Sequence, residues 1–409
     1  MKSAQKLIIP SDRGERWHYI KRMFSSAQGP DLDFNWAGGR LNGLKRLHSI
    51  DVATYARNRN FLNGAVTHLS PYIRHGCITL PEAFNFVKKQ NAPLADRLLM
   101  QLAWREYWQQ VWQIQGDAIF SELEPAKVML GYQSMADDIL KGKTGLPCMD
   151  GFIADLIKTG YVHNHARMWL ASYIVHHRKI DWRAGADWFE SHLLDGDFAS
   201  NHLSWQWVAS TFSSKPYFTN KESLSRFTGE QYCAGCLAQC PFNASYEVLS
   251  SKLFDQTISP AAKQYVITHL PKKAVSTSTA MSVFVHDEML SAANPLLEKP
   301  FPKLFVFDPQ IHGTWSLNRL QFVADSLSEM QDVEVWLGDT YEVLLNRGVG
   351  RVITQDTPNR RIKELLEPFV PKYEPVVKLV KVEVSAQRLK RFSRYWEKVG
   401  PHLLHTPAT

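Results

Sequence analysis

Residues 281–285 read Met-Ser-Val-Phe-Val, a short run of β-forming side chains at the start of the C-terminal third. Runs of the same kind recur at 303–307, 333–337 and 351–354. Helical patterns lie between them, at 316–330 and 339–346. Strands that alternate with helices predict a small parallel α/β sheet. A further run at 376–384 is a candidate for a fifth strand.

The residues before this region follow a different pattern. Apolar side chains recur at helical spacing in 98–108, 151–157 and 163–177, and we find no strand alternation up to residue 250. A polar connector follows, rich in Ser and Thr around 276–279. We therefore predict an all-α domain over residues 1–250, a linker over 251–280 and a smaller α/β domain over 281–409.

The composition is that of a water-soluble globular protein. Of the 409 residues, 44% are hydrophobic and 21% are charged, and the formal net charge of +7 favours a polyanionic partner such as nucleic acid. No uninterrupted apolar stretch approaches 18 residues, and the N-terminal residues lack the apolar core of a secretory signal. We therefore expect a cytoplasmic monomer with no membrane partner.

Three of the five cysteines stand close together, as Cys233, Cys236 and Cys240, and Pro241 follows them. Disulfides are rare in the cytosol, so metal or cluster ligation is the leading use of these thiols. The spacing resembles part of a ferredoxin-type cluster run, and a zinc site could use the same ligands. A four-iron cluster needs a fourth thiolate, for which Cys148 and Cys77 are the candidates.

Two segments place polar side chains on faces of predicted helices. His163, Asn164 and Arg167 share one face at spacings of three and four residues. In the second segment Asp195 and Asp197 precede a helix. The functional interpretation is a buried polar site. The alternatives are an internal salt bridge, a core histidine and carboxylates that only cap a helix.

Six segments in order resemble the FAD-binding domain of photolyases and cryptochromes, over about residues 36–220. They are 38–47, 55–60 with 67–76, 102–108, 143–147, 160–168 and 194–207. The resemblance implies that Tyr55, Thr67, Leu69 and Ser70 hold the FAD phosphates and ribose and that Arg105 reaches a phosphate. It also implies roles along the flavin ring for Asn164, for Arg167 paired with Asp195, for Asp197 and, beside N5, for Asn201.

The same resemblance implies an electron path and a lesion pocket. Trp205 and Trp182 match the family's tryptophan chain, and Tyr132 stands where the outermost tryptophan usually is. The pocket would be lined by Trp104, Met168 and Trp207, with Arg59 on the DNA phosphates.

One residue of this pocket departs from the pattern of cyclobutane-dimer enzymes, because Gln101 replaces the usual glutamate. An amide can hydrogen-bond but cannot supply a proton. A (6-4) photoproduct is therefore an alternative lesion. For that chemistry His163 is the candidate proton donor, unless it is a plain core histidine.

The cysteines and the second domain resemble one bacterial branch of this family. Cys148, before a Met-Asp pair, and Cys233, Cys236 and Cys240 match its 4Fe-4S ligands, which leaves Cys77 as a spare buried thiol. Segments 285–296, 318–327 and 337–344 resemble the Rossmann-like domain that usually comes first. The order is thus inverted, with the FAD-binding domain first, and an antenna chromophore is doubtful in so short an α/β domain.

The resemblance implies a light-driven DNA photolyase, a lyase that repairs UV-induced pyrimidine dimers through reduced FAD. The cyclobutane type is favoured, in single-stranded DNA, because the inverted order resembles a bacterial subgroup that acts mainly on lesions in single strands; base flipping also costs less there. Two alternatives stay open. One is a signalling cryptochrome with the same photochemistry and a protein partner, and the other is a flavoprotein that only binds nucleic acid.

Overall fold

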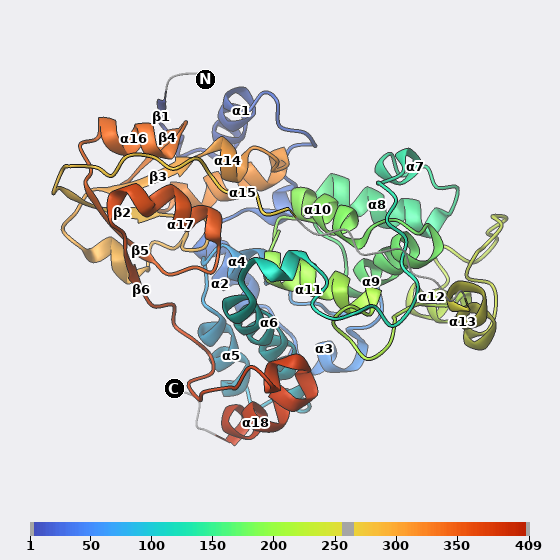
Figure 1. The fold of residues 1–409 in the computed structure, drawn as a ribbon. Coiled ribbons are helices and arrows are strands. Elements are labelled where there is room, and N and C mark those ends of the chain that lie inside the picture. The colour runs from blue at the N-terminus through green and yellow to red at the C-terminus, as the bar shows by residue number, and fades with distance from the viewer. Residues whose placement is uncertain (1–3, 256–265, 406–409) are drawn as a thin grey trace. The chain divides into compact units, whose positions relative to one another are not determined.

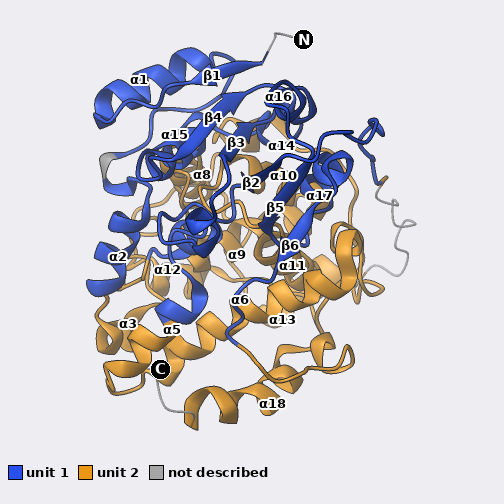
Figure 2. Cartoon of the chain, turned by 90° about the vertical axis from the view of Figure 1, so that its left-hand side faces the viewer, with its two compact units in different colours: residues 1–49, 68–83, 267–379 blue, residues 50–67, 84–266, 380–409 orange. Residues whose placement is uncertain are grey.

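The computed structural model describes residues 4–255 and 266–405 (Figure 1), which fall into two compact units (Figure 2). Unit 1 comprises residues 1–49, 68–83 and 267–379, and unit 2 comprises residues 50–67, 84–266 and 380–409. These boundaries differ from those expected from sequence, because the first 49 residues belong with the sheet and the last 30 with the helices. Part of the expected linker, 256–265, lies outside the described residues. The assignment of functional domains to 1–250 and 281–409 stays a prediction.

Unit 1 is built on a six-stranded sheet with the order β1-β4-β3-β2-β5-β6, in which every pair is parallel except β1 with β4 (Figure 1). Its strands are β1 (Gln5–Leu7), β2 (Met281–Val285), β3 (Lys303–Phe307), β4 (Val333–Leu337), β5 (Arg351–Gln355) and β6 (Lys372–Glu374). Its helices of seven residues or more are α1 (Arg13–Met23), α2 (Arg40–His48), α15 (Leu317–Ser328), α16 (Thr340–Asn346) and α17 (Arg360–Leu366). The shorter α4 (Ser70–Arg74) and α14 (Pro309–His312) complete this unit.

Alternate side chains of the central strands enter two different apolar layers, as expected for a sheet covered on both faces. Phe284, Leu304 and Val306 join one core cluster with side chains of α16 and α17. On the opposite face, the Phe307 ring contacts the Phe24 ring at 5.0 Å. Near-continuous apolar strands of this kind are what made β2 to β5 predictable, and all four form where expected.

Two short edge strands differ from the prediction. The expected strand at 376–384 is wrong, because these residues form no strand and β6 lies earlier, at Lys372–Glu374. Prolines at 371 and 375 bracket β6, and proline cannot donate a backbone hydrogen bond to a ladder. At the other edge, the three-residue β1 pairs antiparallel with β4, although residues 1–250 were expected to hold no strand.

The N-terminal segment is fastened to unit 1 by a buried ion pair. Arg16 on α1 donates to the Asp325 carboxylate on α15 over 2.7 Å, and the Trp17 indole N–H donates to the same oxygen over 3.1 Å. Both partners of the ion pair are almost fully buried. Helix α1 is therefore bound to α15, which explains why the first residues group with elements that come more than 300 residues later.

Unit 2 consists of helices. They are α3 (Val52–Asn58), α5 (Leu80–Lys89, whose first four residues are assigned to unit 1), α6 (Asp96–Gln115), α7 (Asp137–Leu140), α8 (Pro147–Thr159), α9 (Asn164–Ser172), α10 (Trp182–His192), α11 (Phe198–Ala209), α12 (Lys221–Phe227), α13 (Tyr246–Phe254) and α18 (Phe392–His405). A π-helical turn, Tyr173–His177, continues α9, so the predicted helix over 163–177 is confirmed, with His163 as its N-cap. No helix of the described residues is long and apolar enough to cross a membrane.

Helices α10 and α11 pack closely because a glycine lies between them. A Cβ atom added to Gly185 on α10 would lie 2.4 Å from the Trp205 ring on α11, a distance that real contacts do not reach. The Trp205 ring also meets Phe189 edge-on at 5.0 Å. Both rings belong to a core cluster that includes Trp169 and Trp182. Much of the aromatic content of unit 2 is therefore core packing.

Candidate functional site

An arginine–aspartate pair joins the start of α9 to the segment before α11. Arg167 donates from Nη1 to Asp195 Oδ1 over 3.2 Å and from Nη2 to Oδ2 over 3.0 Å, a two-pronged geometry that favours a fixed orientation. Its Nε donates to the Val162 carbonyl over 2.8 Å. The Asp195 side chain is 7% exposed, whereas that of Arg167 is 23% exposed. The expected pair is thus confirmed, and one member remains accessible.

Asp197 caps α11 and holds two side chains of α6. Its Oδ1 accepts from the Ser200 backbone N–H over 2.7 Å. Its Oδ2 accepts from Arg105 over 2.7 Å and from the Gln109 amide over 2.9 Å. In this structure Arg105 therefore pairs with a carboxylate, and its predicted phosphate contact stays a prediction. Sequence reasoning missed Gln109, although it lies one helical turn after Arg105 on the same face.

Two histidines at the start of α9 lie close together. His163 is the N-cap, with Nδ1 accepting from the His165 backbone N–H over 3.2 Å, and the two rings are 5.8 Å apart. Burial lowers the pKa of each to about 4, so both are neutral at neutral pH. His163 Nε2 and His165 Nδ1 are buried without a hydrogen-bond partner among the described residues. His165 was not predicted, and its alternation with His163 was the available signal.

Another buried polar atom without a hydrogen-bond partner among the described residues lies just after α3. This atom is the side-chain oxygen of Asn60, and Arg59 beside it contributes to lowering the His165 pKa. Buried polar atoms are normally hydrogen-bonded, so orphans of this kind indicate a bound group or water. Unit 2 therefore offers polar atoms that a ligand such as FAD could satisfy.

The other predicted flavin contacts fall in different surroundings. Asn201 is buried on α11, where its amide donates to the Ala186 carbonyl over 2.8 Å. Asn164 is exposed, and its amide lies 3.8 Å from the sulfur of Met168. Tyr55 is buried and Thr67 half-buried in unit 2. Leu69 and Ser70 belong to unit 1, at the start of α4.

The three aromatic residues of the predicted electron path all lie around α10. Trp205 packs on Gly185, and Trp182 is the buried first residue of that helix. Tyr132 lies 5.7 Å from the Arg183 guanidinium and donates its hydroxyl hydrogen to Glu122 over 2.9 Å. Burial, together with Glu122, raises the pKa of Tyr132. Glu122 is a partner that sequence reasoning did not identify.

The predicted lesion pocket draws on α6 and α11. Gln101 and Trp104 are half-buried on α6. One face of the Trp104 ring is already stacked on Phe392 of α18, with centroids 3.7 Å apart and planes 10° apart. Trp207 is half-buried on α11 and lies 5.4 Å from the Tyr217 ring. The roles of these residues toward a lesion stay predictions.

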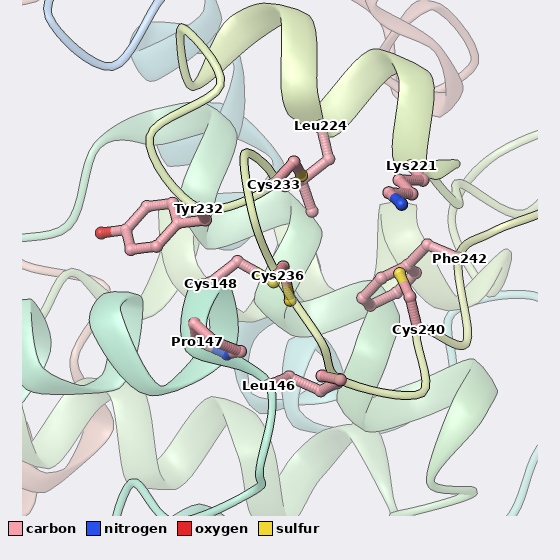
Figure 3. Close-up of a pocket in the computed structure, with 11 residues that line it drawn as sticks. Leu146, Pro147, Cys148, Lys221, Leu224, Tyr232, Cys233, Cys236, Cys240 and Phe242 are labelled. Atoms are coloured by element: carbon pink, nitrogen blue, oxygen red, sulfur yellow. The ribbon is translucent and has the colours of Figure 1, made fainter.

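Four cysteines line one cavity of unit 2 (Figure 3). Cys148 lies in the first turn of α8 and faces the loop that carries Cys233, Cys236 and Cys240, with Lys221 at the rim. Burial raises the pKa of Cys148 to about 12 and also raises that of Cys240. The spare thiol, Cys77, is buried in unit 1 and contacts Ser326.

The four sulfurs do not converge on a single point. In the part of the chain that the structure describes, no three His, Cys, Asp or Glu side chains are arranged to hold one metal ion. Whether these thiols hold a four-iron cluster or a zinc ion stays a prediction.

In unit 1 charged side chains gather at the carboxyl end of β2, and in many open α/β sheets ligands bind at this end of the strands. Arg74 donates to the Asp287 carboxylate over 2.8 Å, and His75 Nδ1 lies 2.8 Å from the Asp287 carbonyl oxygen. Nearby, the Arg319 guanidinium stacks 3.7 Å from the Trp315 ring centroid. The sequence had not predicted this buried charged group.

Comparison with known proteins finds relatives for the helical part of the chain. Residues 98–231 match the family described as the FAD binding domain of DNA photolyase. A deoxyribodipyrimidine photo-lyase of Streptomyces griseus is 35% identical over 181 residues, 42% of this chain and 39% of that protein. A chloroplastic/mitochondrial cryptochrome DASH of Solanum lycopersicum is 31% identical over 190 residues, 43% and 33% of the two chains. The chain thus spans well under half the length of these relatives.

Two solved structures also match in part. The Synechocystis sp. PCC6803 cryptochrome is 23% identical with a TM-score of 0.44, covering 54% of this chain and 56% of that one. A bacterial class III photolyase from Agrobacterium tumefaciens is 27% identical with a TM-score of 0.41, covering 51% and 45%. By the matched segment and its relatives, residues 98–231 are related to the FAD-binding domain of the photolyase/cryptochrome family.

Proposed function

We propose that this protein is a light-driven DNA photolyase that repairs UV-induced pyrimidine dimers, with cyclobutane dimers in single-stranded DNA as the favoured substrate. The observation that carries the proposal is the Arg167–Asp195 pair, which forms as the resemblance implies and lies inside the segment that matches an FAD-binding domain. Bound FAD would supply the light absorption and the one electron that splits the dimer.

The residues of this chain would bind and orient the cofactor. Arg167, fixed by Asp195 but partly exposed, would present positive charge along the ring system. Asp197 and Asn201 would stand at its polar edge, with Arg105 holding Asp197 in place. The unpaired nitrogens of His163 and His165 would find partners on the bound molecule or its waters. Trp205 and Trp182 form the inner part of the proposed aromatic path, and Tyr132 its outer end.

Two residues bear on whether the substrate is a cyclobutane dimer or a (6-4) photoproduct. Gln101 lacks the acidic proton of the usual glutamate, which would slow cyclobutane repair. The candidate proton donor for a (6-4) product, His163, has a pKa lowered to about 4 by burial, so it carries no transferable imidazolium proton at neutral pH. The lowered pKa of His163 weighs against a (6-4) product, and the cyclobutane dimer stays the favoured lesion of this proposal.

The test is repair of defined lesions under light. Photoreduced protein is given single-stranded oligonucleotides with either a cyclobutane dimer or a (6-4) product, with dark controls. We expect light-dependent loss of the cyclobutane dimer, and faster loss in Gln101→Glu than in the native protein. Loss of neither lesion despite normal flavin photoreduction would instead favour a signalling cryptochrome.

We further propose that Cys148, Cys233, Cys236 and Cys240 hold a 4Fe-4S cluster with a structural role. The cluster would tie the first turn of α8 to the loop after α12 through four iron–thiolate bonds. Iron and sulfide analysis should give about four of each per chain. Cys240→Ala should lose the cluster and lower both stability and FAD content, whereas Cys77→Ala should retain it.

Two results would contradict this cluster proposal. Zinc in place of iron in freshly purified protein would establish the alternative metal site. A Cys240→Ala protein that folds and retains FAD but no longer repairs DNA would show that the cluster acts in catalysis and is not only structural.

A further inference from the structure

The last described stretch of unit 2, residues 380–405, is fixed at several points against other parts of the unit, namely helix α6, the segment after it and residue 88. The Tyr107 hydroxyl donates to the Leu389 carbonyl over 2.8 Å. Arg391 donates to both oxygens of Glu124, over 2.5 and 2.8 Å. Near the end of α18, the Lys88 ammonium donates to the Leu403 carbonyl. Helix α18 is therefore a fixed part of the unit, with one face against the protein and another toward solvent.

Aromatic rings form a column from α6 into α18. The Trp104 and Phe392 rings stack at 3.7 Å, and the Phe392 and Trp396 rings follow at 5.9 Å with planes 16° apart. Phe392 is buried, whereas Trp396 at the end of the column is half-buried and so reaches solvent. Gly400 makes room for this ring, because an added Cβ would lie 2.9 Å from Trp396 Cε2.

Basic side chains follow the outer face of the same helix. Arg394, Lys398 and His402 stand at successive spacings of four residues, and all three are exposed. Arg388 and Lys390 are also exposed in the turn before the helix. Residues 380–405 hold six lysines and arginines against two glutamates, a net charge of +4 out of +7 for the whole chain. The stretch is thus the source of much of the protein's positive charge.

We propose that α18 and the turn before it are a binding surface for single-stranded nucleic acid. Phosphates would contact Arg394 and Lys398, and a base would stack on Trp396 as a continuation of the ring column. A basic surface combined with a half-exposed aromatic ring is the usual design of such sites. The inference rests on the proposed function in one respect: the nucleic acid that binds to this surface is taken to be DNA. It assigns binding of the strand to a segment outside the matched FAD-binding region.

The apolar face of α18 argues against an anionic membrane as the occupant. A helix that lies on a bilayer inserts its apolar face among the acyl chains. Here the apolar residues Phe392, Tyr395 and Val399 are already buried in the protein. What remains exposed is mainly charge and part of the Trp396 ring; Leu403 and Leu404 near the end of the helix are only half-buried. Nucleic acid offers phosphates for the basic side chains and bases that can stack on the aromatic ring. It can bind the exposed face of the helix without contacting the buried apolar residues.

The first test uses an undamaged, fluorescein-labelled oligothymidylate in the dark, with binding followed by fluorescence anisotropy at several salt concentrations. Arg394→Gln/Lys398→Gln should weaken binding by up to about 25-fold at 0.1 M salt, and should reduce the slope of log K against log[salt] by about 1.4. The matched control is Lys158→Gln/Lys252→Gln, which removes equal charge from exposed positions on α8 and α13. The control should bind almost as the native protein does.

The second test addresses the ring. Trp396→Leu keeps an apolar side chain but removes the stacking surface, and should weaken binding at least about fivefold with an unchanged salt slope. Trp396→Phe should restore most of the affinity. Circular dichroism and the protection of α18 amides from hydrogen exchange would show whether each variant retains the helix, so that lost binding is not confused with lost structure.

The outcomes separate this inference from the proposed function. Native-like binding by Arg394→Gln/Lys398→Gln, or equal losses in the two double variants, would overturn the α18 surface even if light-dependent repair is found. Absence of repair together with α18-dependent binding would overturn the photolyase proposal and leave the surface standing. Binding to phosphatidylserine vesicles that depends on Arg394 and Lys398, with oligonucleotide binding unchanged, would assign the surface to membranes instead.

Discussion

Each unit contains more than one buried or partly buried arginine–aspartate pair, and one pair from each unit shows a clear difference in exposure to solvent. In unit 1 the side chains of Arg74 and Asp287 are 5% and 2% exposed. In unit 2 those of Arg167 and Asp195 are 23% and 7% exposed. We call the fully buried pair sealed and the partly exposed pair open. A sealed pair can only stabilise the fold, whereas the exposed arginine of an open pair can also contact a ligand. The difference therefore distinguishes a structural centre from a candidate binding site.

The fully buried pair, Arg74 with Asp287, joins two segments that are far apart in the sequence. Arg74 and His75 come from residues 68–83, and both contact Asp287 in the loop directly after β2. The Leu290 backbone N–H donates to the His75 carbonyl over 2.7 Å, and an added Cβ on Gly76 would lie 2.3 Å from the Glu288 carbonyl oxygen. These contacts join a segment early in the sequence to the central strand of the sheet.

The largest expected effect is therefore on the sealed pair. Asp287→Asn should lower the free energy of unfolding by about 3 kcal/mol, because it leaves the Arg74 charge buried with weaker compensation. Glu288, with its carboxylate 3.7 Å from Arg74 Nη1, limits the loss. Urea unfolding followed by circular dichroism measures the change. A loss below about 1 kcal/mol would mean that the pair is not the structural centre that its burial indicates.

The second expected effect is that the stability of unit 1 depends on pH. Burial lowers the pKa of His75 to about 3 and of His312 to about 4, so the folded protein keeps both neutral below the ordinary value of about 6.5. The unfolded chain binds these protons and the folded chain does not. Stability is therefore full above about pH 6.5 and falls as the pH drops toward 4.

Asp287 does not share this pH range. Burial alone would raise its pKa, but Arg74 and neighbouring positive groups lower it, so its contribution to stability is lost only below about pH 4. Hydrogen exchange of the β2 and β3 amides between pH 7 and 5 would isolate the histidine effect. His75→Gln should make the dependence shallower, and an unaltered slope would exclude His75 as its source.

The third effect concerns the open pair. Asp195→Asn should cost about 1 kcal/mol of stability, because water can reach the guanidinium left behind. FAD content after purification should fall much more, since Arg167 would lose its fixed orientation. Asp287→Asn provides the matched control, with a greater loss of stability but normal FAD content in the protein that remains folded. Equal flavin retention in the two variants would contradict the distinction between the pairs.

The sequence predicted those parts of the fold that have long, regular patterns. Strands β2 to β5 form where their apolar runs lie, and the helices over 98–108 and 151–157 form within α6 and α8. The three-residue edge strands β1 and β6 are too short to produce an alternation. The grouping of the first 49 residues with the sheet depends on long-range contacts such as Arg16 with Asp325, which no local pattern shows.

The candidate site was predictable to a similar degree. The Arg167–Asp195 pair followed from matching residues to family motifs, and the structure contains it. The partners of Asp197 were not predictable, because Arg105 and Gln109 approach from a helix about 90 residues earlier in the chain. Stacking of Phe392 on Trp104 joins positions even further apart. Side-chain identity shows what a residue can do, but tertiary packing selects its partner.

The smallest effect is the response of the two pairs to salt. Ions screen charges that water reaches, and screen sealed charges much less. Between 0.1 and 1 M NaCl, the stability difference between native protein and Asp195→Asn should shrink by a few tenths of a kcal/mol, whereas that for Asp287→Asn should not change. Sodium chloride also alters stability generally, and comparing each variant with the native protein at the same salt removes that contribution. If both differences shrank equally, water would reach Arg74 as readily as Arg167, and the contrast between a sealed and an open pair would fail.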